Sequence, residues 1–243
     1  MKKLFLIIAC STSIGLYAQN KPVTQAHKST PIKKATVAVK QHISHERLIE
    51  ITTDYGVMVA RLYDSTPKNR DNFVSKVQAG FYDSLLFHRV IKEFMIQGGD
   101  PTSKLATDSS QLGSGEAPGP RIDAELRADL IHKKGALAIA RDNNPEKAGS
   151  NCQFYIVQGK KYDSTALSQV YQRVKNANPS FVYTPAQSEI YRRLGGTPFL
   201  DQNYTVFGEV ISGLDVIDKI EAVQTRPGDR PIKDVRMKIR LLN

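Results

Sequence analysis

The sequence contains little cysteine and histidine and no tryptophan, and these shortages restrict the kinds of protein it can encode. Its 243 residues include two cysteines, Cys10 and Cys152, and five histidines. Two cysteines form at most one disulfide, which excludes a scaffold held together by several disulfides. Three histidines precede residue 46, and the other two, His88 and His132, show no metal-ligand spacing. We therefore expect no metal ion, no cofactor and a fold that depends on its hydrophobic core.

A long hydrophobic run is also missing. Lys2 and Lys3 precede an apolar stretch at residues 4–17, which is too short to span a membrane comfortably, and Ala18 follows it. A basic start, a short apolar centre and a small residue are typical of a secretory signal peptide. We predict a signal peptide at residues 1–18, no transmembrane span, and export to the periplasm.

A second interpretation of the N-terminus stays open. Residues 7–10 resemble a lipoprotein box, which would leave Cys10 lipidated and the protein tethered to a membrane. After ordinary cleavage behind Ala18, Cys152 would be the only cysteine, and no internal disulfide could form. Both interpretations place the rest of the chain outside the cytoplasm.

The chain is basic, with a formal net charge of +10. Removal of residues 1–18 takes away Lys2 and Lys3 and no acidic residue, so two of these charges would be lost. A basic surface can attract nucleic acid or anionic membrane. Because the charges are scattered and export separates the protein from nucleic acid, we expect no nucleic-acid partner.

The composition changes near residue 46. Residues 19–45 are rich in Lys, Thr, Gln and Pro and predict a flexible basic tether. In the folded domain that we expect at residues 46–243, Thr66 and Pro67 predict the N-cap and first position of a helix that Gly80 ends. A second amphipathic helix is predicted at residues 214–223.

Most of the remaining domain is predicted to form short strands. A hairpin is predicted around residues 54–56, and further strand-like runs follow; these lie at residues 87–97, 135–140, 153–157, 204–210 and 235–241. Many short strands with two separated helices favour a mainly β fold, a barrel or a sandwich. Residues 161–198 interrupt this pattern with helical spacing, and Thr184 with Gln187 predicts a capping box inside this helical insertion.

The most specific motif is FHRVIKEFMIQGGD at residues 87–100, which combines one arginine, polar side chains and large apolar groups. It resembles the signature of the cyclophilin family of peptidyl-prolyl cis-trans isomerases along its whole length. Residues 135–141, 150–156 and 199–208 resemble three further family segments in the family's order. The resemblance extends over about residues 47–242.

This resemblance implies a closed eight-stranded antiparallel β-barrel with a helix capping each end, here carrying a helical insertion. It implies a peptidyl-prolyl isomerase (rotamase) without a cofactor, whose partners are proline-containing polypeptides. The catalytic residue would be Arg89. The substrate-binding residues would be Phe94, Met95, Gln97, Ala140, Arg141, Gln153, Tyr155, Phe199, Leu200 and Tyr204.

The chemistry follows from the prolyl amide. Resonance opposes rotation with a barrier of about 18–20 kcal/mol. A donor aimed at the amide nitrogen stabilises the twisted state, and Arg89 offers permanent charge and fixed N–H directions. A 10⁵-fold acceleration needs about 7 kcal/mol. One placed donor supplies only about 3–4 kcal/mol, so an apolar pocket and backbone contacts must share the remainder.

Each assignment has a simpler rival. Arg89 could be an ion-paired surface arginine, and the apolar candidates, like Phe154, could be core residues. His88 is expected to pack and hydrogen-bond rather than transfer protons. Cys152 is expected to be a small buried residue rather than a nucleophile.

Four positions depart from the family pattern. Tyr155 replaces a phenylalanine and adds a hydroxyl near the proline ring, while Tyr204 replaces a histidine. Arg141 replaces an asparagine, and its charge favours acidic or polar substrates. Phe199 replaces a tryptophan whose N–H helps cyclophilins bind cyclosporin, so we expect weak cyclosporin sensitivity.

Three functions therefore compete. The leading hypothesis is an exported isomerase that assists the folding of other exported proteins. The alternative is a proline-peptide-binding chaperone or interaction module with little catalysis, which would use the insertion at residues 161–198 and the tether. A hydrolase or metalloenzyme is a distant third.

Overall fold

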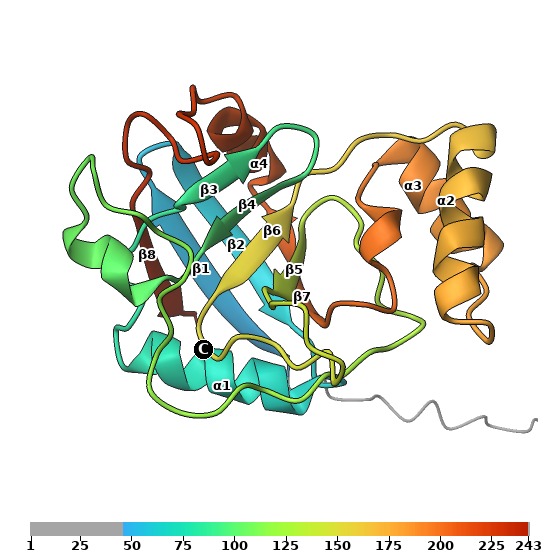
Figure 1. Ribbon diagram of the computed structural model, residues 1–243, viewed down its shortest axis with the longest axis horizontal. Coiled ribbons are helices and arrows are strands. Elements are labelled where there is room, and N and C mark those ends of the chain that lie inside the picture. The colour runs from blue at the N-terminus through green and yellow to red at the C-terminus, as the bar shows by residue number, and fades with distance from the viewer. Residues whose placement is uncertain (1–45, 243) are drawn as a thin grey trace, which may run out of the picture. The chain divides into compact units, whose positions relative to one another are not determined.

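The computed structural model describes residues 46–242 (Figure 1). The predicted signal peptide at 1–18, the tether at 19–45 and Cys10 lie outside the described residues, as does Asn243. The described part forms an antiparallel sheet with four α-helices, in the order β1 (Arg47–Thr53), β2 (Gly56–Leu62), α1 (Pro67–Gln78), β3 (Arg89–Ile91), β4 (Met95–Gly98), β5 (Ala136–Ile139), β6 (Phe154–Val157), α2 (Ser164–Ala177), α3 (Pro185–Arg193), β7 (Val206–Ser212), α4 (Leu214–Glu221) and β8 (Met237–Leu241). Two short 3₁₀ helices lie at Pro101–Leu105 and Pro198–Leu200.

The eight strands form one sheet in the order β3-β4-β6-β5-β7-β2-β1-β8, and every neighbouring pair is antiparallel. The sheet curls into a half-barrel (Figure 1). The predicted hairpin is present, since β1 pairs with β2 in register from Arg47 opposite Leu62 to Thr53 opposite Gly56. The eight predicted antiparallel strands are thus present near the predicted positions, together with four α-helices.

The prediction of a closed barrel is not confirmed. The edge strands β3 and β8 lie at the two ends of the strand order and do not pair with each other. The chain before β3 approaches β8 through a single bridge between Leu86 and Arg236. Three backbone hydrogen bonds lie beside that bridge, from Ser84 N to Met237 O, from Phe87 N to Val235 O and from Met237 N to Leu85 O, all 2.9 Å. This contact is too short to make the ladder continuous.

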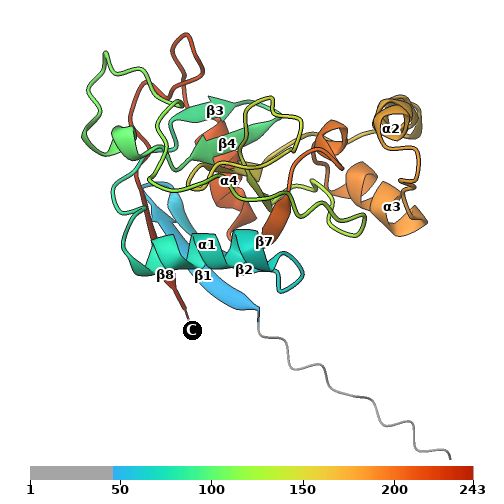
Figure 2. The same cartoon turned by 60° about the horizontal axis from the view of Figure 1, so that its bottom comes forward.

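Alternation along the strands places one row of side chains in the core. Ile49 and Ile51 of β1 are fully buried, as are Met58 and Ala60 opposite them on β2. Helix α1 packs beside β7 and β8, and α4 packs beside β2, β3 and β4 (Figure 2). Phe73 of α1 is the centre of an aromatic cluster; its ring centroid lies 4.8 Å from that of Tyr82, 5.2 Å from that of Phe154 and 5.1 Å from that of Phe207. The predicted core role of Phe154 is confirmed.

The start of α1 differs from its prediction in one respect. Thr66 occupies the N-cap position and Pro67 follows, but the Thr66 side chain makes no capping hydrogen bond. The carboxylate of Glu125, distant in the sequence, accepts instead from the backbone amides of Lys68 (3.1 Å) and Asn69 (2.9 Å). A carboxylate suits this position because unpaired amides and the helix dipole favour negative charge there.

The insertion contains two helices, α2 and α3, and has its own small core. The predicted capping box is present: Thr184 N donates to Gln187 Oε1 (2.9 Å), and Gln187 N donates to Thr184 Oγ1 (3.2 Å). A separate buried cluster joins Ile131 to the insertion residues Tyr162, Leu167 and Tyr191.

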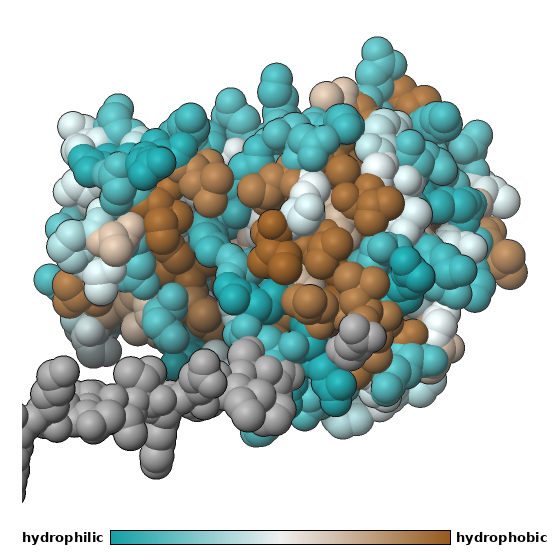
Figure 3. Space-filling model, turned by 180° about the vertical axis from the view of Figure 1, so that it is seen from behind, coloured by the Kyte–Doolittle hydropathy of each residue, from teal (hydrophilic) through white to brown (hydrophobic). Residues whose placement is uncertain are grey.

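Seen from behind the view of Figure 1, the surface of the domain shows groups of hydrophobic side chains separated by hydrophilic ones (Figure 3).

Gly196 lies near the end of the insertion, where isolated bridges join it to Lys133 and Lys160, and its replacement by alanine should be strongly destabilising. Its φ is +151°, and an added Cβ would lie 2.2 Å from His132 O and 2.7 Å from Tyr191 Cε1. We expect Gly196→Ala to lower the free energy of unfolding by about 3 kcal/mol or more in urea titrations. Gly228 has φ +89° with nothing within 4 Å of an added Cβ, so Gly228→Ala should cost only about 1–2 kcal/mol. If both variants lost the same free energy of unfolding, backbone strain alone would explain both losses and the clash at Gly196 would contribute nothing.

Candidate active site

A pocket of about 180 Å³ opens where β3, β4, β5 and β6 meet the chain after the second 3₁₀ helix. Every residue that lines it was predicted from the sequence; they are Arg89, Phe94, Met95, Gln97, Ala140, Arg141, Tyr155, Leu200 and Tyr204. These side chains come from four separate sequence segments, which the fold brings together. The pocket is the candidate active site.

Arg89 stands at the polar side of this pocket. It lies on β3 directly opposite Gln97 of β4. Its Nη1 lies 3.4 Å from Gln97 Oε1 and its Nε 3.4 Å from Asp229 Oδ2, and its side chain is 42% exposed. Both contacts are long, and an exposed ion pair contributes little to stability. The guanidinium is therefore oriented by its neighbours while still able to donate to a ligand.

A chain of amides orients Gln97. Its Nε2 donates to Gln153 Oε1 (3.1 Å), and Gln153 Nε2 donates to the carbonyls of Gly113 (3.0 Å) and Gly115 (2.8 Å). This pattern turns Gln97 Oε1 toward Arg89. Gln153 is buried and lines the neighbouring pocket rather than this one, so it acts here by holding Gln97.

The opposite side of the pocket is apolar. Met95, Tyr155 and Leu200 are 2%, 4% and 8% exposed and belong to one buried cluster, against which Phe94 packs. The rival interpretation of these side chains as core residues is therefore partly right, since they serve both the core and the pocket. A cavity with this wall suits an apolar ring of about the size of proline.

The hydroxyl of Tyr155 does not face the pocket as expected from the sequence. It lies 3.1 Å from His132 Nε2, while His132 Nδ1 lies 2.7 Å from Asp201 Oδ1. A carboxylate accepts hydrogen bonds, so we assign the proton to Nδ1, and Tyr155 then donates to Nε2. Burial raises the pKa of the Tyr155 phenol. The pocket thus keeps an apolar ring surface, and His132 is a site residue that no local motif identified.

Arg141 is fixed above Tyr204. Its guanidinium lies 4.7 Å from the centre of the Tyr204 ring, and it donates from Nε to Asn203 O (2.9 Å) and from Nη2 to Asn203 Oδ1 (2.8 Å). No carboxylate pairs with Arg141 among residues 46–242. Its positive charge therefore remains beside the pocket, and the predicted preference for acidic or polar substrates stays a prediction.

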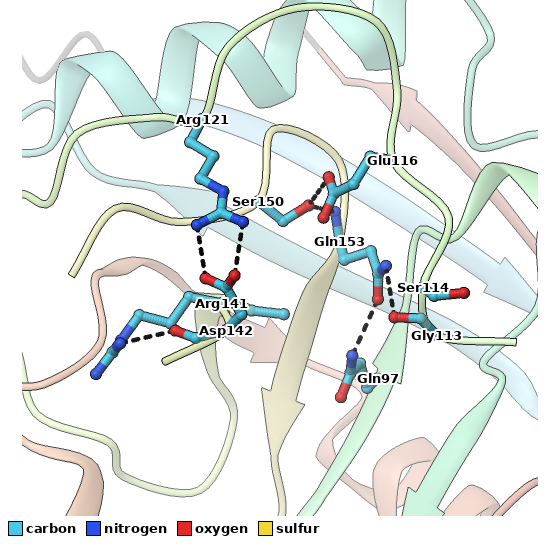
Figure 4. A pocket seen from close by; sticks show the side chains of 10 residues that line it. Gln97, Gly113, Ser114, Glu116, Arg121, Arg141, Asp142, Ser150 and Gln153 are labelled. Carbon is cyan, nitrogen blue, oxygen red and sulfur yellow. Dashed lines mark hydrogen bonds and ion pairs between the residues drawn. The ribbon is translucent and has the colours of Figure 1, made fainter. Parts of the chain in front are cut away.

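A second pocket of about 350 Å³ adjoins the first and shares Gln97, Ala140 and Arg141 with it (Figure 4). Its other lining residues are Gly113, Ser114, Glu116, Arg121, Asp142, Ser150 and Gln153. Arg121 and Asp142 form two parallel hydrogen bonds of 2.7 and 2.6 Å across its rim. Except for Gln153 these additional residues were not among the predicted site residues, and they lie in irregular segments whose positions depend on the tertiary fold.

Phe199 is the one predicted site residue that lines neither pocket. Its side chain is exposed (47%), and its ring centroid lies 5.7 Å from that of Phe94. It belongs to the 3₁₀ helix Pro198–Leu200, which directs Leu200 inward and leaves Phe199 at the surface. Phe199 therefore lies at the surface beside Phe94, outside both pockets.

Neither His88 nor Cys152 has the environment of a reactive group. Both are buried and outside the candidate pocket, and burial raises the pKa of the Cys152 thiol. Residues 46–242 contain no cluster of three side chains able to hold a metal ion. Within the same residues, no helix has the length and apolar character needed to cross a membrane.

His88 should make the protein less stable in mild acid. Burial lowers the pKa of its ring from 6.5 to about 4. Between these pH values the unfolded chain binds a proton that the folded chain does not, so stability falls as pH decreases from 6.5 to 4. The loss is at most about 1.4 kcal/mol per pH unit. Urea titrations at several pH values should show a shallower dependence for His88→Gln than for the wild type; equal slopes would contradict this origin.

Comparison with known proteins agrees with the geometry. A family model described as "Cyclophilin type peptidyl-prolyl cis-trans isomerase/CLD" matches residues 48–240. A protein of Staphylococcus aureus (strain USA300) named "Putative peptidyl-prolyl cis-trans isomerase" is 36% identical over 184 residues, covering 75% of this chain and 85% of that protein. A Staphylococcus epidermidis protein of the same name is 34% identical over 197 residues, covering 81% and 91%.

Solved structures are similar as well. The crystal structure of a Cryptosporidium parvum cyclophilin type peptidyl-prolyl cis-trans isomerase superposes with a TM-score of 0.59 at 25% identity. The match covers 82% of this chain and 99% of that one. A structure of the same protein in the presence of the dipeptide Ala-Pro gives a TM-score of 0.58 and also 25% identity, covering 81% and 99%.

Proposed function

Because the chain belongs to the cyclophilin-type peptidyl-prolyl cis-trans isomerase family, we propose that the pocket around Arg89 binds proline and catalyses rotation without a covalent intermediate. The observation that carries this mechanism is the position of Arg89, a permanent donor opposite an apolar wall. The solved relative that was crystallised in the presence of Ala-Pro supports a proline-containing ligand.

The two sides of the pocket have different tasks. Met95, Tyr155 and Leu200 would hold the proline ring and exclude water, which disfavours the planar, more polar amide. Arg89 would donate to the prolyl nitrogen once twisting has localised its lone pair. A single such donor contributes about 3–4 kcal/mol to transition-state stabilisation, so we expect it to be the largest contribution from one residue.

The second pocket would receive the substrate on one side of the proline. Gln97, Ala140 and Arg141 line both pockets, and a peptide extended from one to the other must pass them. Gln97 would bond the substrate backbone, and the amide chain through Gln153 holds it for that purpose. This arrangement suits unfolded or extended polypeptides rather than small molecules.

We further propose that the protein is exported, to the periplasm, and assists the folding of other exported proteins there. The order of basic, apolar and small residues at positions 1–18 supports export, and Cys10 offers the alternative of a lipid-anchored form. Uncatalysed prolyl isomerisation takes tens to hundreds of seconds, so it can limit folding wherever prolines are present.

A chaperone or interaction module with little catalysis is the second candidate. The observation in its favour is the apolar surface outside the pocket, including Val182 (62% exposed) and Leu194 (37% exposed) in the insertion. The experiment that separates the two functions is cis-to-trans relaxation of an Ala-Pro tetrapeptide at low temperature. Strong acceleration by the protein that lacks residues 1–18 supports catalysis, and no acceleration by a folded protein would leave a binder.

Phe199 should limit the affinity for cyclosporin. Its exposed ring lies beside the Phe94 ring but lacks the N–H that tryptophan offers at this position in cyclophilins. One neutral hydrogen bond contributes about 1 kcal/mol, so Phe199→Trp should tighten cyclosporin binding about fivefold. Calorimetric titration of both proteins measures this difference. A submicromolar inhibition constant for the wild type would refute the expectation of weak sensitivity.

A further inference from the structure

The helical insertion lines no part of the proline pocket, yet two of its tyrosines reach toward it. Tyr183 follows α2 and Tyr191 lies on α3, and their hydroxyls are 2.5 and 2.6 Å from Oδ2 of Asp201. Asp201 is 1% exposed and follows Leu200 of the pocket wall directly. The insertion therefore contacts the segment that forms part of the pocket.

The other oxygen of Asp201 faces the pocket side. Oδ1 accepts from His132 N (2.8 Å) and from His132 Nδ1 (2.7 Å), and His132 Nε2 accepts from Tyr155. The carboxylate thus has four donors, two from the insertion and two from His132. A buried carboxylate is costly unless its hydrogen bonds are satisfied, so loss of donors on one side disturbs the whole network.

We propose that the insertion is a positioning element of the proline pocket and that Tyr183 and Tyr191 are positioning residues. They hold the Asp201 carboxylate, which in turn fixes Leu200 next to it and, through His132, the ring of Tyr155. Two walls of the pocket thus depend on hydroxyls outside it. This inference rests on the proposed function, because it assumes that the pocket binds the proline.

Two other tyrosines of the insertion provide matched controls. Tyr162 packs against Tyr191 with a centroid distance of 6.5 Å, and its hydroxyl has no hydrogen bond among the described residues. Tyr171 donates to Phe181 O (3.3 Å) and does not reach Asp201. Tyr162→Phe removes a hydroxyl from the same cluster, and Tyr171→Phe removes a hydrogen bond inside the insertion, without touching the network.

The test is the isomerase kcat/KM of the Tyr183→Phe/Tyr191→Phe double variant, measured well below its melting temperature. We expect a loss of about tenfold, with each control variant within about twofold of the wild type. A folded double variant with wild-type kcat/KM overturns the proposal. So does an equal loss in the controls, because that result would reflect general loosening of the insertion.

A double-mutant cycle with Tyr155→Phe adds a measurement that a merely structural role would not affect. If the insertion acts through His132, the Tyr183→Phe/Tyr191→Phe pair should lower kcat/KM only about threefold in the Tyr155→Phe background. This smaller loss would be the part of the effect that acts through Leu200. A full tenfold loss in that background would overturn the route through Tyr155. If the wild type itself is inactive, the proposed function fails instead, which distinguishes the two failures.

Discussion

Replacement of Arg89 by alanine should lower kcat/KM for an Ala-Pro tetrapeptide by about 10²–10³-fold, the usual effect of removing one transition-state donor. The physical reason is that the apolar wall offers no alternative donor at that position. Because its side chain is 42% exposed and its two contacts are both 3.4 Å long, the substitution should leave the free energy of unfolding nearly unchanged. Activity and stability should therefore separate in this variant.

Two further variants make the Arg89 experiment decisive. Arg89→Lys keeps the charge but loses the planar arrangement of N–H groups, so we expect most of the loss to remain. Arg240→Ala removes an exposed arginine of β8 that pairs with Glu50, and it should keep wild-type activity. If Arg89→Ala retained a third or more of the wild-type rate, Arg89 would be an ordinary surface arginine and the wall alone would have to account for catalysis.

Replacement of Asp201 by alanine should be among the most destabilising single changes in the domain. It would remove the acceptor for His132, Tyr183 and Tyr191, whose polar groups would remain buried without a partner. Breaking a buried charged network from one side costs about 3–5 kcal/mol. Urea denaturation of the wild type and the variant at neutral pH measures this loss.

The matched control for Asp201 is Asp215→Ala on α4. Asp215 pairs with Lys219 one helical turn away, and both side chains are more than half exposed. An exposed pair of this kind contributes about 0.3–0.5 kcal/mol. A comparable loss from both aspartates would show that the network around Asp201 contributes no more than an exposed ion pair.

Local patterns were sufficient for much of the secondary structure and for most of the site. Strand-like runs on both sides of residues 54–56 predicted the hairpin of β1 and β2, and the spacing of Thr184 and Gln187 predicted a capping box that is present. Each of these features depends on residues at most a few positions apart. The strand-like run at residues 87–97 also contained both Arg89 and Gln97, which the structure pairs directly across β3 and β4.

Features that depend on contacts between distant segments could not be predicted in the same way. Glu125 caps α1, although Thr66 holds the N-cap position, because a loop brings its carboxylate to the amides. Likewise, closure of the barrel was predicted but is not confirmed, because it depends on whether the distant edge strands β3 and β8 pair, and they do not.

The amino-acid sequence by itself determined the family, the strand pattern and the side chains that line the candidate pocket, since motif and periodicity are properties of neighbouring residues. Only the tertiary structure decided that Phe199 lies outside the pocket, that the Tyr155 hydroxyl turns to His132, and that the insertion reaches Asp201. The reason is that a buried polar group must find its partner within about 3 Å in space. Which distant residue supplies that partner is settled by how the chain folds back on itself.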